Sequence, residues 1–429
     1  MNPTLKFDIV QDGETIEQEL IDFYKLEPRD TFYSDSGDIK VKFVGIVQQG
    51  GNILVSVPKH FGYVNKIKKY NDEKKKKYIR LIMDSIYQNS MDPNDNTDFD
   101  PSVDINTNFS LSAYYNIYQY FTKYGLYYEK HQQIKPQNGN RISWKDTIKR
   151  SQKFISNDNL IFYPIYYKKD KSDENIVTEC MIFAINYTTQ LFSGLMDLPS
   201  NARIANYKVS MDILNTKVIN KLQEILSRTF KDIDKYLIQN IIIFFQNSIL
   251  SLKKGISIKC YNYAAIWETA VNKYLYEHFD KVEDNKVRFT PLDKVISNKF
   301  VKKPVYYNTV TKYNKWYVEP DHLLIDDVNK QVYIFDSKYY RDLKDIDHKQ
   351  FMYHVLFSNR FSKYTIFDSL VVPYEKESVT EQYVNIASEY LFHPKNNTKY
   401  KMKPITIYLT RLNTITVLKN YINNTRGAS

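Results

Sequence analysis

The sequence lacks several residue patterns on which common protein sites depend. It has only two cysteines, Cys180 and Cys260, so neither a disulfide framework nor a cysteine zinc site can be built. Its 7 histidines show no H-E-x-x-H or related metal-binding spacing. No G-x-x-x-x-G-K-[ST] segment occurs, so the chain has no recognisable phosphate-binding loop of its own. If nucleotide energy is needed, a partner must supply it.

Long apolar runs and targeting segments are also missing. Residues 1–8 contain no apolar core of the kind found in a secretory signal. The most apolar stretch, residues 236–252, is interrupted by glutamine and asparagine and predicts a buried helix instead of a membrane span. We therefore expect a cytoplasmic protein with no membrane partner.

Charged residues are plentiful, and positive ones predominate. The chain has 60 Lys and Arg against 49 Asp and Glu, which gives a formal net charge of +11. A basic protein suits a polyanionic partner, because each lysine or arginine that meets a phosphate releases condensed counterions. Lysine-rich codon usage in an AT-rich genome would produce the same excess. The charge therefore leaves both explanations open.

The length of 429 residues allows two or three domains, and 43% apolar residues can form sizeable cores. We place a boundary at Gly255, between a mixed N-terminal region (1–255, one or two subdomains) and a C-terminal domain (256–429). The polar, turn-rich residues 91–110 predict a mobile loop. A lysine-rich segment at 66–80 is either the exposed face of a helix or a DNA-backbone contact.

Periodicity predicts several elements of the N-terminal region. Residues 40–47 and 53–57 flank a glycine-containing loop and are typical of a β-hairpin. Residues 160–167 and 181–185 have the composition of strands. Apolar residues at helical spacing predict two helices between residues 211 and 254.

In the C-terminal domain, a helix is predicted from Asn262 to about Phe279, with an apolar stripe that includes Trp267 and Val271. Glu268 lies at the edge of this stripe. A carboxylate on the edge of a buried face is unfavourable unless something satisfies it. Glu268 therefore either reaches water or a lysine, or belongs to a site.

Two strands are predicted at 317–325 and 331–339, joined by a turn. If the loop is residues 327–330, antiparallel pairing places Asp321 opposite Asp336, at about 5 Å. Asp336 and Lys338 then share one face of their strand. His322 points to the opposite face and is interpreted as structural. A change of one residue in the loop would break this register.

Such a pair of carboxylates predicts a divalent metal site. Carboxylates this close repel each other unless a cation neutralises them, and oxygen ligands suit Mg²⁺. A bound metal can hold a phosphate oxygen, acidify a water and stabilise the leaving oxygen. Lys338 would orient or deprotonate that water, and Glu268 would complete the acidic shell.

The tripeptide by itself is unspecific, because an acid two residues before a lysine recurs six times elsewhere in the chain. What separates Asp336–Lys338 is that it ends an apolar strand, with Pro320-Asp321 across the expected hairpin. A solvated strand end with a surface ion pair is the alternative.

The segments Pro320-Asp321 and Asp336-Ser337-Lys338 together resemble the PD-(D/E)xK nuclease motif, and Ile266-Trp267-Glu268 resembles its acidic helix. Residues 350–354 resemble the glutamine-aromatic helix of the RecB- and McrC-like branch. Gln350 matches, but His354 stands where a tyrosine is usual. Residues 139–148 resemble LlaJI-type restriction components.

The resemblance implies an α/β fold in which a mixed N-terminal domain precedes a PD-(D/E)xK restriction-endonuclease-like core. Catalytic roles are implied for Asp321, Asp336, Lys338, Glu268 and Gln350, and Mg²⁺ would bind Asp321, Asp336 and Glu268. The expected core contains the helix at 262–279, a mixed sheet and a helix packed on one face of that sheet. The sheet strands are expected at 317–325, 331–339, 368–373 and 404–410, and the packed helix at 345–358.

Members of this family serve as nuclease subunits of restriction systems together with a McrB-like AAA+ GTPase. The resemblance therefore implies Mg²⁺-dependent cleavage of double-stranded DNA by the C-terminal domain, with DNA recognition and partner docking in residues 1–255. Two alternatives are a non-catalytic DNA-binding or assembly subunit and a repair or RNA nuclease of the same fold. The complete acid, acid and lysine set argues against the first alternative.

Overall fold

The structure is a computed structural model, and a defined set of residues can be described. They are residues 6–88, 104–136, 141–157, 159–173, 175–193, 195, 198, 202–207, 214–307, 316–341, 343, 348–386, 390–392, 399–401 and 405–423. Most of the loop expected at 91–110 lies outside them. Within them, helices alternate with small sheets throughout, which confirms the predicted mixed α/β class.

The chain forms two compact units. The first unit contains residues 1–107, 194–196 and 254–429, and the second contains residues 108–193 and 197–253. A boundary therefore falls beside Gly255, but residues 1–107 group with the C-terminal part of the chain. The functional division into 1–255 and 256–429 stays a prediction.

The N-terminal sheet of the first unit has the strand order β1-β5-β4-β12-β6. The predicted hairpin is confirmed as β4 and β5, with β1 parallel to β5 on its outer side. A side chain at Gly45 would collide with the Ile258 carbonyl oxygen of β12, so this position requires glycine. The strands are β1 (Lys6–Gln11), β4 (Val44–Gln49), β5 (Asn52–Val57), β6 (Ile105–Thr107) and β12 (Ser257–Cys260).

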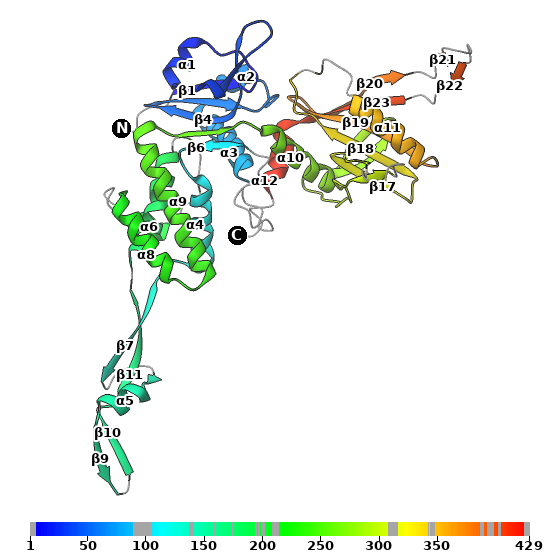
Figure 1. Cartoon of the computed structure of the whole chain (residues 1–429). Coiled ribbons are helices and arrows are strands. Elements are labelled where there is room, and N and C mark those ends of the chain that lie inside the picture. Colours follow the sequence, from blue (N-terminus) through cyan, green and yellow to red (C-terminus); the bar gives the residue numbers. More distant parts are fainter. Residues whose placement is uncertain are drawn as a thin grey trace. The chain divides into compact units, whose positions relative to one another are not determined.

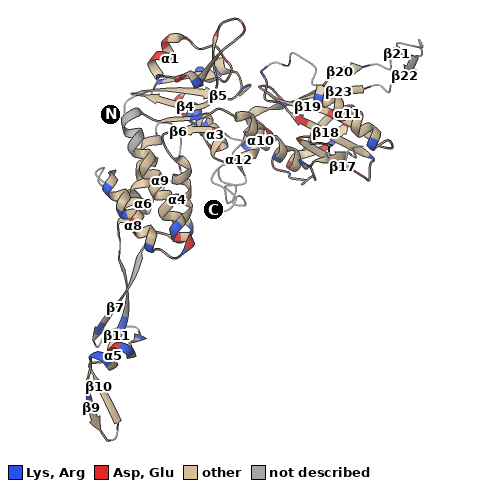
Figure 2. Cartoon of the chain, viewed as in Figure 1, with Lys and Arg blue, Asp and Glu red and all other residues tan. Residues whose placement is uncertain are grey.

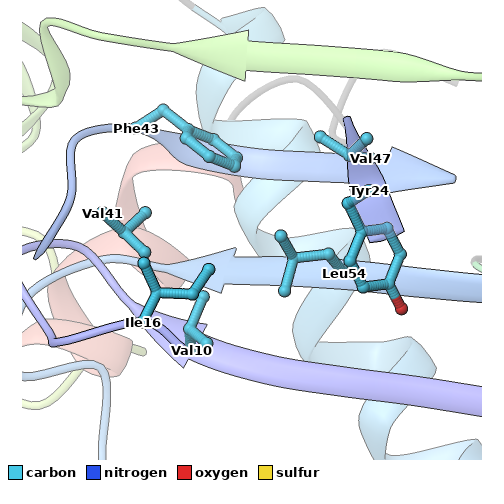
Figure 3. Close-up of a cluster of buried hydrophobic side chains, with 7 residues drawn as sticks. All are labelled: Val10, Ile16, Tyr24, Val41, Phe43, Val47 and Leu54. Carbon is cyan, nitrogen blue, oxygen red and sulfur yellow. The ribbon is translucent and has the colours of Figure 1, made fainter. Parts of the chain in front are cut away.

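One face of this sheet buries an apolar cluster that Figure 3 shows. Its members come from strands of this sheet, from β3 (Ile39–Val41), from α1 (Gln18–Tyr24) and from the intervening loops: Val10, Ile16, Tyr24, Val41, Phe43, Val47 and Leu54. The lysine-rich segment includes the start of α3 (Asp72–Gln88), a helix that turns Ile82, Met83 and Ile86 inward. Helix α3 packs against α12 (Thr414–Asn423), which also packs against α10 (Tyr263–His278).

The C-terminal sheet of the first unit has the order β17-β18-β19-β23-β20 and is mixed, as expected (Figure 1). Strands β18, β19 and β23 are parallel, while the edge strands β17 and β20 run antiparallel to their neighbours. Helix α11 (His348–Arg360) packs on β18, β19 and β23. The strands are β17 (His322–Asp326), β18 (Gln331–Ser337), β19 (Thr365–Tyr374), β20 (Val379–Ile386) and β23 (Ile405–Asn413).

The single strand predicted at 317–325 is wrong, because the structure divides it into β16 (Trp316–Val318) and β17. Residues 319–321 between them are not in a strand. Pro320 has no N–H to donate to a ladder, which explains the interruption. The interruption leaves Asp321 at the entrance to β17.

The second unit contains α4 (Leu111–Tyr124), α6 (Ile176–Phe192), α8 (Thr216–Arg228) and α9 (Asp232–Lys254). Helices α8 and α9 confirm the two predicted between 211 and 254. The strand predicted at 181–185 is wrong, since these residues lie within α6. Asn175 caps α6 at its N-terminus. The residues of α6 are buried on nearly all sides, so apolar residues 181–185 show no helical spacing in the sequence.

The second unit also holds a strand-rich extension. It consists of β7 (Glu129–Pro136), β8 (Arg141–Ile142), α5 (Trp144–Arg150), β9 (Gln152–Ser156), β10 (Asn159–Tyr163) and β11 (Tyr166–Asp173). Among the described strands, β9 and β10 pair only with each other. Other described elements of the chain are η1 (Pro28–Asp30), β2 (Thr31–Tyr33), β3 (Ile39–Val41), α2 (Val64–Lys68), α7 (Ala202–Ala205), β13 (Phe279–Glu283), β14 (Lys286–Phe289), β15 (Val305–Tyr307), β21 (Tyr390–Phe392) and β22 (Lys399–Lys401). None of the helices in the described ranges is long and apolar enough to cross a bilayer.

Candidate active site

The β17–β18 hairpin positions the two central aspartates. Its register pairs His322 with Phe335 and Asp326 with Gln331, which confirms the predicted pairing. Asp326 fixes the turn by accepting hydrogen bonds from the backbone N–H groups of Val328 and Asn329. The same register continued by one residue brings Asp321 beside the end of β18.

Asp321 is tied directly to β18. Its Oδ2 accepts a hydrogen bond of 2.9 Å from the backbone N–H of Ser337. This bond takes the place of a ladder bond at the strand end. It holds the Asp321 carboxylate next to the Asp336-Ser337-Lys338 segment.

Asp336 is fully buried, with a side chain that is 0% exposed. Lys338 Nζ lies 2.5 Å from its Oδ2, and Lys349 Nζ lies 3.7 Å from its Oδ1. Apart from these ion pairs, no donor in the described part of the chain hydrogen-bonds either oxygen. A buried carboxylate with so few donors is suited to bind a cation.

Burial, together with the charges of Asp336 and Glu268, raises the pKa of Asp321 to about 7. The Ser337 N–H acts in the opposite direction. The three carboxylates are therefore close enough to repel one another. In the absence of a metal ion, a proton on Asp321 relieves this repulsion.

Glu268 projects from α10 and forms an ion pair with Lys302. In the described ranges, no group of three His, Cys, Asp or Glu side chains is arranged to hold a metal ion. Mg²⁺, however, is commonly held by one or two carboxylates together with substrate phosphates and waters. Asp321 and Asp336 fit that donor set, while Glu268 would first have to leave Lys302.

The structure places Gln350 in a buried polar cluster that the sequence analysis missed. Gln350 Nε2 donates a hydrogen bond to Asp368 Oδ1, and His354 Nδ1 lies 3.5 Å from Asp368 Oδ2. Asp368 on β19 pairs in register with Ile334, two residues before Asp336, so both acids face α11. Burial raises the pKa of Asp368 to about 6. The sequence feature that could have revealed this cluster is Asp368 itself, an aspartate within an otherwise apolar strand.

His322 supports the hairpin from the other face. Its Nδ1 lies 3.1 Å from Asn272 Oδ1 on α10, and its Nε2 lies 2.7 Å from Ser337 Oγ. Burial, and secondarily Lys302, lowers the pKa of His322 to about 3, so the ring is neutral. His322 thereby connects α10 to the residue that holds Asp321.

Replacing Asp321 with asparagine should stabilise the metal-free protein at pH 8. The raised pKa means that the folded protein keeps a proton that the unfolded chain loses near pH 4. Stability is therefore lost as the pH rises from about 4 through 7, and the full penalty applies above 7. We expect the Tm of Asp321→Asn in EDTA to exceed that of the wild type by about 2 °C or more at pH 8, and the difference to vanish near pH 4. A lower Tm at pH 8 would contradict this account.

Comparison with known proteins shows the family to which the chain belongs. No curated protein sequence matches the chain. A solved structure that matches is the refined half-complex from the tetradecameric assembly of Thermococcus gammatolerans McrB AAA+ hexamers with bound McrC, with 10% identity, coverage of 99% of this chain and 100% of that one, and a TM-score of 0.37. The model of the LlaJI restriction endonuclease family matches residues 43–406, which is most of the sequence. The chain belongs to the LlaJI restriction endonuclease family.

Proposed function

We propose that the chain is the nuclease subunit of a restriction system and hydrolyses phosphodiester bonds of double-stranded DNA with Mg²⁺. The observation that carries this proposal is the buried Asp336, with Lys338 Nζ at 2.5 Å and Asp321 held beside it by Ser337. Membership of a restriction endonuclease family supports the same conclusion.

Each side chain has a distinct task in the proposed reaction. Asp321 and Asp336 would hold the cation, with Glu268 assisting once it is released from Lys302. When bound, Mg²⁺ supplies a Lewis acid for a phosphate oxygen and a bound water of lowered pKa. Lys338, paired with Asp336, would orient the attacking water and offset charge on the phosphate. Gln350 would act through Asp368, to which it is bonded.

We also propose a McrB-like AAA+ GTPase partner, on the basis of the sequence resemblance and the missing phosphate-binding loop. The β9–β10 hairpin is a candidate docking surface for a protein, because several of its apolar side chains are exposed. Exposed apolar patches of this kind mark protein interaction sites. They include Phe154, Ile155, Leu160, Ile161 and Tyr163, with Trp144 and Ile148 on the adjacent α5. Figure 2 shows lysines and arginines gathered on α5.

Plasmid cleavage tests the proposed function. The purified protein would be incubated with Mg²⁺ and methylated or unmethylated plasmid, with and without a McrB-like AAA+ protein and GTP or ATP. Cutting supports the nuclease, and dependence on the partner supports the restriction complex. DNA binding without cutting under every condition would favour the assembly-subunit alternative. Cutting of RNA alone, or of free ends alone, would favour the repair or RNA nuclease.

The hairpin can be tested separately. We expect the double variant Phe154→Ser with Ile155→Ser to weaken binding of the AAA+ partner at least about tenfold, because exposed apolar anchors dominate interface energy. Binding can be measured by biolayer interferometry. Val328→Ser, at another exposed apolar residue, in the β17–β18 turn, is the control. Equal affinity of the hairpin variant and the control would rule out docking at β9–β10.

A further inference from the structure

The backbone that follows Lys338 is held by the N-terminal sheet, within the same compact unit. Strand β18 ends at Ser337, so residues 339–341, called here the exit segment, have no ladder to direct them. Two loops reach this segment. One contains Asp12 and Gly13 after β1, and the other contains Lys59 and His60 after β5.

Tyr339 is the centre of these contacts. Its hydroxyl accepts a hydrogen bond of 2.8 Å from the Lys59 backbone N–H. The Asp12 carboxylate interacts with the same hydroxyl, and burial together with the charge of Asp12 raises the pKa of Tyr339. Lys59 Nζ donates to the Tyr339 carbonyl oxygen at 3.3 Å and lies 4.6 Å above the Tyr339 ring. The hydroxyl therefore interacts with both loops.

The cluster is buried, so its members depend on one another. Tyr339 is 8% exposed, and its ring lies 5.6 Å from that of Tyr263 on α10. Burial raises the pKa of Asp12, while Lys59, 3.7 Å away, and the Tyr339 hydroxyl counteract that effect. Removing one buried polar member takes a partner away from the others, which can be more costly than the lost bond itself.

The end of the exit segment is anchored as well. His60 Nε2 lies 2.7 Å from the Arg341 carbonyl oxygen, and His60 Nδ1 lies 3.0 Å from Glu375 Oε2. Arg341 Nη1 donates to the Gly13 carbonyl oxygen at 3.2 Å. The exit segment is therefore fixed at both ends by the same two loops.

Lys338 lies between two restraints as a result. Its backbone N–H donates to the Val371 carbonyl oxygen at 2.8 Å, which fixes its near side to β19. The exit segment fixes its far side. We propose that Tyr339 is a positioning residue, which uses Asp12 and Lys59 of the N-terminal sheet to set the place of Lys338 in the catalytic site. This inference rests on the proposed nuclease function.

Kinetics of Tyr339→Phe test the proposal, with Tyr340→Phe as the matched control, because Tyr340 is the next residue and is 51% exposed. A misplacement of a reacting group by about 1 Å can cost about 10²-fold in rate. For Tyr339→Phe we expect kcat to fall by about 10- to 100-fold, with KM and the Kd for DNA within about twofold of wild type. Tyr340→Phe should leave all three unchanged. A fall in KM and kcat together, or the same fall in both variants, would overturn the proposal.

Variants of Asp12 test whether it acts together with Tyr339. Asp12→Ala should reproduce the loss of kcat, and combining it with Tyr339→Phe should add little, because both remove one interaction. Asp12→Asn keeps an acceptor for the hydroxyl and should retain most of the activity. Losses that simply multiply in the double variant would argue against a shared role.

Hydrogen exchange separates this proposal from the proposed function. If the wild type does not cut DNA under any condition, the nuclease proposal fails. The rate of amide hydrogen exchange across residues 337–341 still measures how firmly the exit segment is held. Exchange there should be at least about tenfold faster in Tyr339→Phe than in Tyr340→Phe. Equal exchange in the two variants would show that the Tyr339 hydroxyl does not restrain Lys338.

Discussion

Replacing Asp336 with asparagine is expected to lower kcat for plasmid cleavage by about 10³-fold or more, the scale seen when a central catalytic residue is removed. The amide keeps the shape of the side chain but removes the charge that faces Lys338 at 2.5 Å. A neutral amide holds Mg²⁺ far less well than a carboxylate. DNA binding, measured by fluorescence anisotropy in Ca²⁺, should stay within a few-fold of wild type.

The chain offers a matched control for this variant in Asp284, which also stands two residues before a lysine, Lys286. Asp284 lies in the β13–β14 turn with φ at 49°, a conformation that asparagine adopts readily. Asp284→Asn should therefore cut plasmid like the wild type. Activity of Asp336→Asn within about tenfold of the control would remove Asp336 from the catalytic centre and favour the non-catalytic alternative.

Local rules were sufficient to predict the hairpin that carries the site. The turn around Asp326 and the apolar strands on either side defined the pairing of β17 with β18, and the structure confirms that register. The helix of Glu268 was equally readable, because its apolar stripe recurs over four turns. Roles of Asp321, Asp336 and Glu268 in metal binding stay predictions, since no ligand tests them.

Contacts between distant segments could not be predicted in the same way. Asp12 and Lys59 reach Tyr339 across more than 270 positions, and no periodicity links such segments. Asp368 was missed for a different reason: its strand was recognised by apolar composition, and a buried acid within it becomes meaningful only beside Gln350 and His354. The helical residues 181–185 were misread because a fully buried helix has no polar face to reveal its period.

Replacing Lys338 with methionine is expected to lower kcat by about 10²- to 10³-fold, with a small change in the Kd for DNA. Its ammonium group lies 2.5 Å from Asp336, a proposed metal ligand, and the side chain is only 16% exposed. Lys338→Arg should recover little activity, because a planar guanidinium cannot occupy the place of a compact ammonium. Single-turnover cleavage in Mg²⁺ measures the chemical step directly.

Lys349 is the control residue for Lys338, since both lysines lie near Asp336. Lys349 Nζ is farther away, at 3.7 Å, and its side chain is 48% exposed. Lys349→Met should therefore cost less than about tenfold in kcat, because an exposed ion pair contributes little. In EDTA, Lys338→Met should also have the lower Tm of the two, since it removes the closer partner of a buried charge. Equal losses of kcat in the two variants would mean that Lys338 acts only by its charge, and the proposed orientation of the attacking water would be wrong.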